Sequence, residues 1–265
     1  MVKSVYFSFM KKAFQQKYIY RSDSYIYIFT SLLSFFVQIS IWFALYSGKE
    51  SVNGITLPDM MNYVIINLIV SSFTRSNMGN RLATKVSDGS IEADFVRPVN
   101  FKYYFIFEQI GENLFYTVFG TIPICIIAAL FLQFKFSIDV IKLLLFFISL
   151  FNGIILIYFI NYTFGLLSFW FKTALYATWY IRACFDLFGG TFVPLWFYPS
   201  FLLKISSYLP FRLISFEPIS IYLGKYTNAE SLQIILLQLF WIVVFLLIEK
   251  VIWARAQKII TIQGG

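Results

Sequence analysis

The sequence contains no histidine and only two cysteines among its 265 residues. Histidine is the side chain most often used as a general base or a metal ligand near neutral pH, so its absence removes the simplest routes to those chemistries. Cys125 and Cys184 both lie inside apolar segments, which gives no evidence of a disulfide framework or a thiolate metal site. We therefore expect no catalytic, cofactor-binding or metal-binding residues in this chain.

Charged residues are also scarce. They make up 13% of the chain, while hydrophobic residues make up 59% and the mean hydropathy is +0.74. A typical soluble domain is about one quarter charged, so this composition predicts a polytopic membrane protein. The net charge of +8 does not indicate a nucleic-acid partner, because membrane proteins collect Lys and Arg in their cytoplasmic loops.

Apolar runs of about 20 residues predict membrane-crossing helices, and we expect a single all-α transmembrane domain over residues 1–265. Residues 1–22 combine aromatic side chains with five basic ones, which is typical of an amphipathic helix lying at the membrane surface. Pro123 is expected to kink the third span. The six predicted spans are residues 25–46, 60–77, 104–134, 143–171, 175–193 and 232–254.

The pattern changes between the fifth and sixth predicted spans. Residues 194–230 hold four of the seven prolines, and the apolar pieces between them are too short to cross a bilayer. They predict broken or re-entrant helices. Most of the Lys and Arg residues lie at the span ends that are on the same side of the membrane as the two termini. Because cytoplasmic loops are enriched in Lys and Arg, we expect both termini in the cytoplasm and residues 194–230 outside the cell. The chain is then expected to be a multi-pass protein of the plasma membrane.

Residues 79–102, which we call the handle, follow the second predicted span and contain seven charged residues between Arg81 and Lys102. The pair Asp88-Gly89 is a turn signal between two stretches of helical periodicity. Ser90 is expected to cap the second of these helices, and Ile91 with Phe95 gives it an apolar edge. We therefore predict that the handle is a compact helix–turn–helix in the cytoplasm to which a separate partner binds.

Two pairs of charged residues fall in or near predicted spans. Arg182 and Asp186 are one helical turn apart, so they either line a translocation path or dimer seam, or neutralise each other and lock helix packing. Glu108 and Glu112 also share a helix face. One interpretation is that the two glutamates share a proton or a basic partner, with Glu112 on the translocation path or at the dimer seam. The other is that both lie in water at the inner membrane surface.

Several motifs occur in a characteristic order. Residues 188–199 read FGGTFVPLWFYP, and they are followed by LPF at 209–211 and EP at 217–218. The handle reads DGSIE before the Arg97-Pro98 pair, and the chain ends on Gly264-Gly265 after a basic stretch. With the interfacial helix, the six spans and the handle, these motifs resemble those of ABC-2-type transporter permeases over essentially the whole chain.

The resemblance implies a half-transporter that works beside a second permease subunit, identical or homologous. It also implies two separate ABC ATPase subunits that carry ATP and Mg, since this sequence has no GxxxxGK[ST] phosphate-binding loop. The handle then becomes the coupling helix, with Ile91 and Phe95 as an apolar plug in the ATPase. The ATPase-coupling residues that follow from this are Asp88, Gly89, Ile91, Glu92, Phe95 and Arg97.

The aromatic residues after the fifth span have two interpretations. Phe192, Trp196 and Phe197 form either an outer gate of the path or an interfacial aromatic belt.

The leading functional hypothesis is an exporter subunit that is not an enzyme by itself. It moves an amphipathic or hydrophobic substrate, such as a drug, a peptide antibiotic or a lipid-linked molecule, out of the cytoplasm or the inner leaflet, and membrane lipid is a further expected partner. Two alternatives remain open at this point, namely a membrane-embedded enzyme that acts on lipid through Glu108 and Glu112, and an ion-coupled carrier that uses Arg182 and Asp186.

Overall fold

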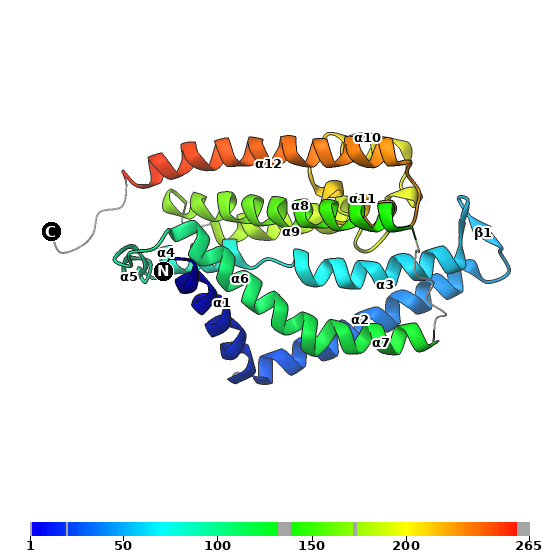
Figure 1. Cartoon of the computed structure of the whole chain (residues 1–265), viewed down its shortest axis with the longest axis horizontal. Helices are drawn as coiled ribbons and strands as arrows, with labels where there is room; N and C mark the ends of the chain where they lie inside the picture. Colours follow the sequence, from blue (N-terminus) through cyan, green and yellow to red (C-terminus); the bar gives the residue numbers. More distant parts are fainter. Residues whose placement is uncertain (1, 20, 132–138, 172–173, 259–265) are drawn as a thin grey trace.

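A computed structural model describes residues 2–19, 21–131, 139–171 and 174–258. Long helices run side by side along the longest axis of the molecule (Figure 1). The start of α1, the handle helices α4 and α5, and the end of α12 lie at one end, which we call the handle end. The hairpin that contains β1 and the short helix α10 lie at the opposite end (Figure 1).

The fold is all-α apart from one two-stranded hairpin, β1 with β2. The elements are α1 Val2–Ile19, α2 Arg21–Tyr46, β1 Ser51–Val52, β2 Ile55–Thr56, α3 Leu57–Thr74, α4 Met78–Ser87, α5 Glu92–Phe95, α6 Phe101–Tyr116, the π-helical η1 Thr117–Thr121, α7 Ile122–Phe131, α8 Val140–Gly165, η2 Leu166–Phe169, α9 Ala174–Phe188, η3 Leu195–Phe197, α10 Ser200–Ser207, η4 Phe211–Leu213, α11 Phe216–Tyr222 and α12 Asn228–Ala256.

Three of the long helices, α3, α8 and α12, begin at side chains that cap their first turn. The Thr56 hydroxyl accepts a hydrogen bond from the backbone N–H of Asp59 at the start of α3, and Asp139 does the same for two N–H groups of α8. Thr227 and Glu230 form a reciprocal capping box at α12. These caps satisfy N–H groups that have no partner inside the helix, and they define where each helix starts.

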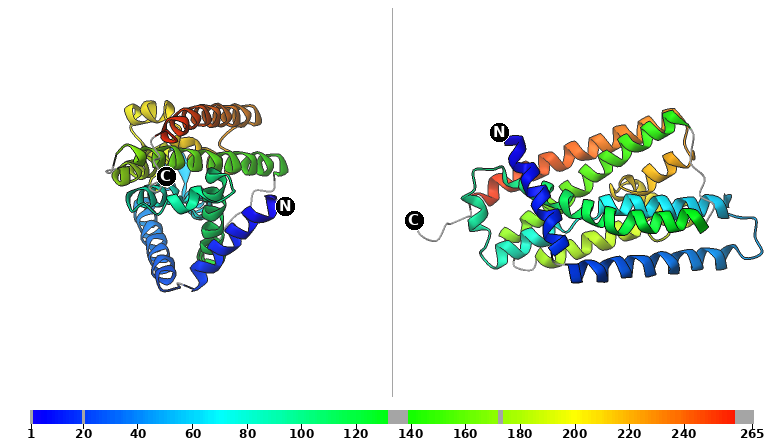
Figure 2. Two further views of the ribbon diagram at one scale, coloured as in Figure 1. Left: turned by 90° about the vertical axis from the view of Figure 1, so that its left-hand side faces the viewer. Right: turned by 60° about the horizontal axis from the view of Figure 1, so that its bottom comes forward.

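Helix α1 crosses the bundle at an angle and packs along α6 (Figure 2). A Cβ added to Gly111 of α6 would lie 2.1 Å from the backbone oxygen of Met10 in α1, so only glycine allows this approach. Helices α6 and α7 form one bent unit (Figure 1). The predicted kink takes the form of the π-helical segment η1, which ends at Thr121, two residues before Pro123, a residue that cannot donate the regular helical hydrogen bond.

Two predicted spans extend past the C-terminal end of the helix observed. Helix α3 ends at Thr74 instead of residue 77, and α9 ends at Phe188 instead of residue 193. The reason at α9 is the Gly189-Gly190 pair, because Gly190 has a φ of +75° and leaves the helical conformation. The predicted end of the third span beyond Phe131 and the terminal Gly-Gly lie outside the described residues.

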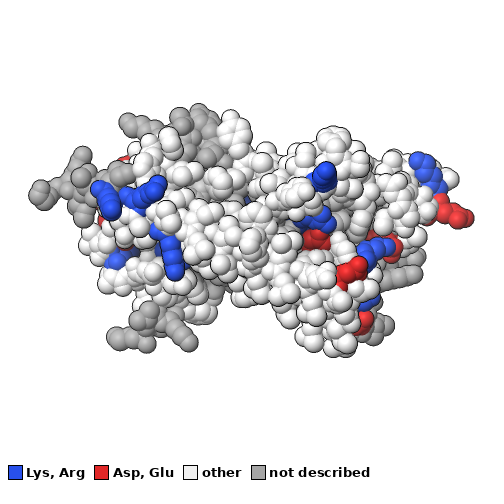
Figure 3. All heavy atoms as spheres, turned by 90° about the horizontal axis from the view of Figure 1, so that it is seen from above, with Lys and Arg blue, Asp and Glu red and all other residues white. Residues whose placement is uncertain are grey.

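Within the described residues, four helical stretches are long and apolar enough to cross a membrane, namely Ser24–Tyr46, Phe101–Leu130, Val140–Phe169 and Asn228–Ala256. Charged side chains gather toward the two ends of the molecule, with an uncharged band between them on the visible face (Figure 3). This distribution is that of a protein whose middle lies in hydrocarbon. The chain is therefore an all-α membrane protein.

Candidate functional site

The handle forms the predicted helix–turn–helix at one end of the molecule (Figure 1). The turn is at Gly89, whose φ of +76° suits glycine. The prediction that Ser90 caps the second helix is wrong, because Ser90 lies in the turn and makes no side-chain cap bond to α5. Its backbone N–H instead donates to the Asp88 carboxylate at 2.9 Å. This hydrogen bond and a second one from the Ser90 hydroxyl both lower the pKa of Asp88.

A buried carboxylate holds the handle together. The side chain of Asp94 is 2% exposed and forms ion pairs with Lys85 of α4 and with Arg97, the latter at 3.1 Å. The backbone N–H of Ile91 also donates to the Lys85 carbonyl at 3.1 Å. The two short helices are therefore tied to each other and form one unit.

The apolar edge of the handle faces the rest of this chain. Ile91 is only 6% exposed and belongs to a hydrophobic core with residues of α6 and α8. Phe95 stacks on Phe101 of α6 at 5.1 Å between ring centroids, and Phe101 stacks on Trp253 of α12 at 5.4 Å. The prediction that Ile91 and Phe95 form a plug exposed to a partner is therefore wrong, because these side chains anchor the handle to α6 and α12.

The exposed face of the handle is formed by other residues. Asp88 and Gly89 are exposed as predicted, Arg97 is exposed although it is tied to Asp94, and Glu92 is half-buried. Val96 is 80% exposed, which is high for an apolar side chain. Val96 was not predicted as a site residue, because its position beyond α5 is not part of the helical repeat that identified Ile91 and Phe95.

Helix α4 makes a close contact with the end of α8. A Cβ added to Gly165 would lie 2.9 Å from the Cα of Gly79, so this approach depends on the absence of a side chain at Gly165. Leu82 is fully buried beside this contact. The handle thus rests on α8 through α4 as well as on α6 and α12 through α5.

The two glutamates of α6 are bound to basic residues from other elements. Arg81 of α4 contacts Glu112 at 3.1 Å and Glu108 at 3.6 Å, and Lys17 of α1 contacts Glu112 at 3.5 Å. Glu112 does not line the polar groove described below. It joins the handle to α6 and α1, which differs from its predicted place on a translocation path.

A buried amide network beside this cluster holds the short connection between α3 and α4. The side-chain nitrogen of Asn113 donates to the backbone oxygens of Phe73 and Arg75, at 2.9 and 2.8 Å. The Gln109 side-chain oxygen accepts from the backbone N–H of Asn77 at 2.9 Å. Neither amide was predicted as a site residue, although their four-residue spacing places them on one face of a helix.

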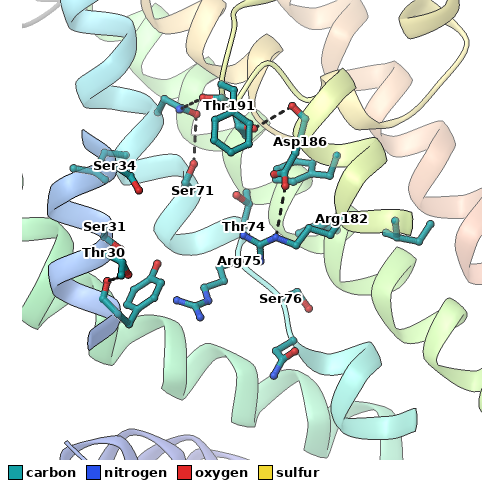
Figure 4. A pocket seen from close by; sticks show the side chains of 18 of the residues that line it. Thr30, Ser31, Ser34, Ser71, Thr74, Arg75, Ser76, Arg182, Asp186 and Thr191 are labelled. Atoms are coloured by element: carbon teal, nitrogen blue, oxygen red, sulfur yellow. Dashed lines mark hydrogen bonds and ion pairs between the residues drawn. The ribbon is translucent and has the colours of Figure 1, made fainter. Parts of the chain in front are cut away.

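A polar groove with a volume of about 600 Å³ lies between α2, α3 and α9 (Figure 4). Many of its lining residues carry hydroxyl or amide groups, including Ser31, Ser34, Asn67 and Ser71. The predicted pair of Arg182 and Asp186 is confirmed by a 3.6 Å contact, and both side chains line the groove. The described charged residues in the lining are these two and Arg75.

The three predicted gate residues lie in different environments. Phe192 lines the groove and is 65% exposed. Trp196 and Phe197 are half-buried and pack against Tyr63 at 5.3 Å and Trp42 at 5.1 Å, respectively. The structure therefore places Phe192 at the groove and the other two in the packing of the opposite end.

A family model described as ABC-2 family transporter protein matches residues 29–264. No curated protein and no solved structure matches the chain. The matched range contains the handle, the groove and the proline-rich segment, in the order that the sequence motifs indicated. The chain is therefore a membrane permease that belongs to the ABC-2 transporter family.

Proposed function

We propose that this chain is the membrane-spanning subunit of an ATP-driven exporter. Permeases of its family generally work with ABC ATPases, and the sequence has no phosphate-binding loop of its own. The observation that carries the proposal is the handle, which has an exposed outer face and a base packed on α6, α8 and α12. A partner that moves the handle would move these three helices with it.

Six membrane crossings, by α2, α3, the bent unit α6 to α7, α8, α9 and α12, belong to this proposal. Helices α3 and α9 are not among the four described stretches that are long and apolar enough to cross a membrane, and both line the polar groove. The groove explains why these two helices contain Asn, Ser, Arg and Asp side chains, because polar groups at membrane depth face a protein interior or a wet cavity. We place the handle end on the cytoplasmic side of the plasma membrane, with α1 at the membrane surface.

The working complex consists of two permease chains, identical or homologous, and two ATPase subunits that bind ATP and Mg. The groove between α2, α3 and α9 carries the substrate, an amphipathic or hydrophobic molecule that leaves the cytoplasm or the inner leaflet. Drugs, peptide antibiotics and lipid-linked molecules have this character. Glu108 and Glu112 are both engaged by Arg81, which favours a structural role for them over lipid chemistry.

The docking face can be tested on its exposed residues. We expect the double variant Ala93→Asp, Val96→Asp to lose co-purification of the cognate ATPase while the permease stays folded, because both positions are exposed. Tyr208→Asp is the matched control, as Tyr208 is an exposed apolar residue at the opposite end. Unchanged co-purification and ATPase stimulation with the double variant would refute the docking role of the handle.

A further inference from the structure

Arg75 lies in the connection between α3 and α4, at the handle end of the groove, and its side chain points into it (Figure 4). The guanidinium carbon is 3.7 Å from the ring centroid of Tyr27 and 4.8 Å from that of Tyr116. No hydrogen bond or ion pair joins this guanidinium to any described residue, and its Nη1 atom is buried without a partner.

In this arrangement the N–H donors of the Arg75 guanidinium have no acceptor among the described residues. Arginine stays ionised in proteins and presents five N–H donors in a planar fork. The two aromatic rings attract the cation, but their faces do not replace oxygen acceptors. A buried polar atom without a partner is unfavourable, so an arginine held in this state inside a membrane protein indicates a ligand that supplies the missing oxygens.

The rest of the lining fits such a ligand. Arg182 and Asp186 cancel each other, so Arg75 gives the described lining a net charge of +1. Hydroxyl and amide side chains of α2 and α3 line the same groove as the guanidinium, and Phe35 and Phe192 add apolar surface to the lining. An anionic group with hydrogen-bonding neighbours and an apolar tail would match each of these features.

We propose that Arg75 binds the phosphate or carboxylate head group of an amphipathic ligand by a bidentate contact, with the polar lining around the head group. This inference rests on the groove being the substrate site of the proposed exporter. It narrows the substrate class to amphiphiles that carry an oxyanion, and it gives Arg75 a role in recognition that differs from the structural roles of Arg81 and Arg97.

The test is binding to the purified full chain in nanodiscs of zwitterionic lipid, measured by calorimetry with empty nanodiscs as background. The probes are n-octyl phosphate, the uncharged n-octyl glucoside and inorganic phosphate. We expect the wild type to bind octyl phosphate and not octyl glucoside. Arg75→Met should weaken octyl phosphate binding by about 10- to 100-fold, the range set by charge-assisted hydrogen bonds.

Two further variants define the specificity. Arg75→Lys keeps the charge without the fork and should lose about tenfold, because Lys does not make the bidentate contact. Arg255→Met is the matched control, because Arg255 is exposed near the end of α12 and does not line the groove, and it should change binding by less than about threefold.

Equal affinity for octyl phosphate and octyl glucoside in the wild type overturns the proposal without any variant, as does unchanged binding in a folded Arg75→Met protein. Inorganic phosphate that binds as tightly as octyl phosphate overturns the amphiphile assignment and leaves a free-anion site. The measurement needs no ATPase, so it stands apart from the docking test. If the chain binds octyl phosphate through Arg75 but does not bind the ATPase, the exporter proposal is contradicted and the anion-binding role of Arg75 stands.

Discussion

The handle and the groove use their basic residues in different ways. In and around the handle, Lys85 and Arg97 share Asp94, Arg81 binds Glu112, and Lys102 binds Glu249 of α12 at 2.8 Å. In the groove, Arg75 has no ion pair to a described residue, and the 3.6 Å contact of Arg182 with Asp186 involves a side chain that is 69% exposed.

This comparison separates structural charges from available ones. A carboxylate removed from water needs its counter-ions, so the pairs at the handle hold elements in place. An arginine that contacts only aromatic rings keeps its donors for another molecule. The handle is therefore expected to depend on its internal contacts, and the groove is expected to tolerate changes to its charges with little loss of stability.

The largest expected effect concerns the anchor of the handle. Phe101→Ala removes the ring that stacks on both Phe95 and Trp253, and it should cost about 3 kcal/mol, as for other buried Phe→Ala changes. Thermal unfolding of the purified chain measures it. Phe29→Ala is the control because Phe29 is exposed, and it should change stability little. Equal melting temperatures for the two variants would contradict the anchoring role.

A smaller effect is expected at the centre of the handle. Asp94→Asn removes the shared charge between Lys85 and Arg97, and it should cost about 2 kcal/mol, between the values for buried and exposed pairs, because the two basic groups remain partly exposed to water. Limited proteolysis should then cut between α4 and α5 faster than in the wild type. Asp88→Asn, at an exposed carboxylate, serves as control. Equal cutting rates in both variants would show that Asp94 does not lock the handle.

The smallest effect is expected in the groove. Arg182→Gln should change the free energy of unfolding by no more than about 0.5 kcal/mol, because this pair is exposed and its contact is long. The melting temperature in detergent is again the measurement. A loss as large as that of Asp94→Asn would mean that the groove charges are structural, which would remove the distinction between the two regions.

The sequence by itself determined the membrane class, the long helices and the position of the handle. These depend on local properties, namely apolar length, turn residues such as Gly89 and helix-capping side chains, and each of these acts within a few residues. The family also followed from the order of short motifs along the chain, and the match over residues 29–264 agrees with it.

Only the tertiary structure decided which side of each element faces a neighbour. Helical spacing put Ile91 and Phe95 on one edge of α5, but the aromatic residues of α6 and α12 turn that edge inward and leave Val96 exposed. Spacing likewise paired Glu108 with Glu112 and did not show that Arg81 reaches both. Only the tertiary structure shows that Arg75 is in the groove without an ion pair to a described residue, while Arg182 is paired with Asp186. Such assignments depend on contacts between residues far apart in the sequence, which local patterns do not encode.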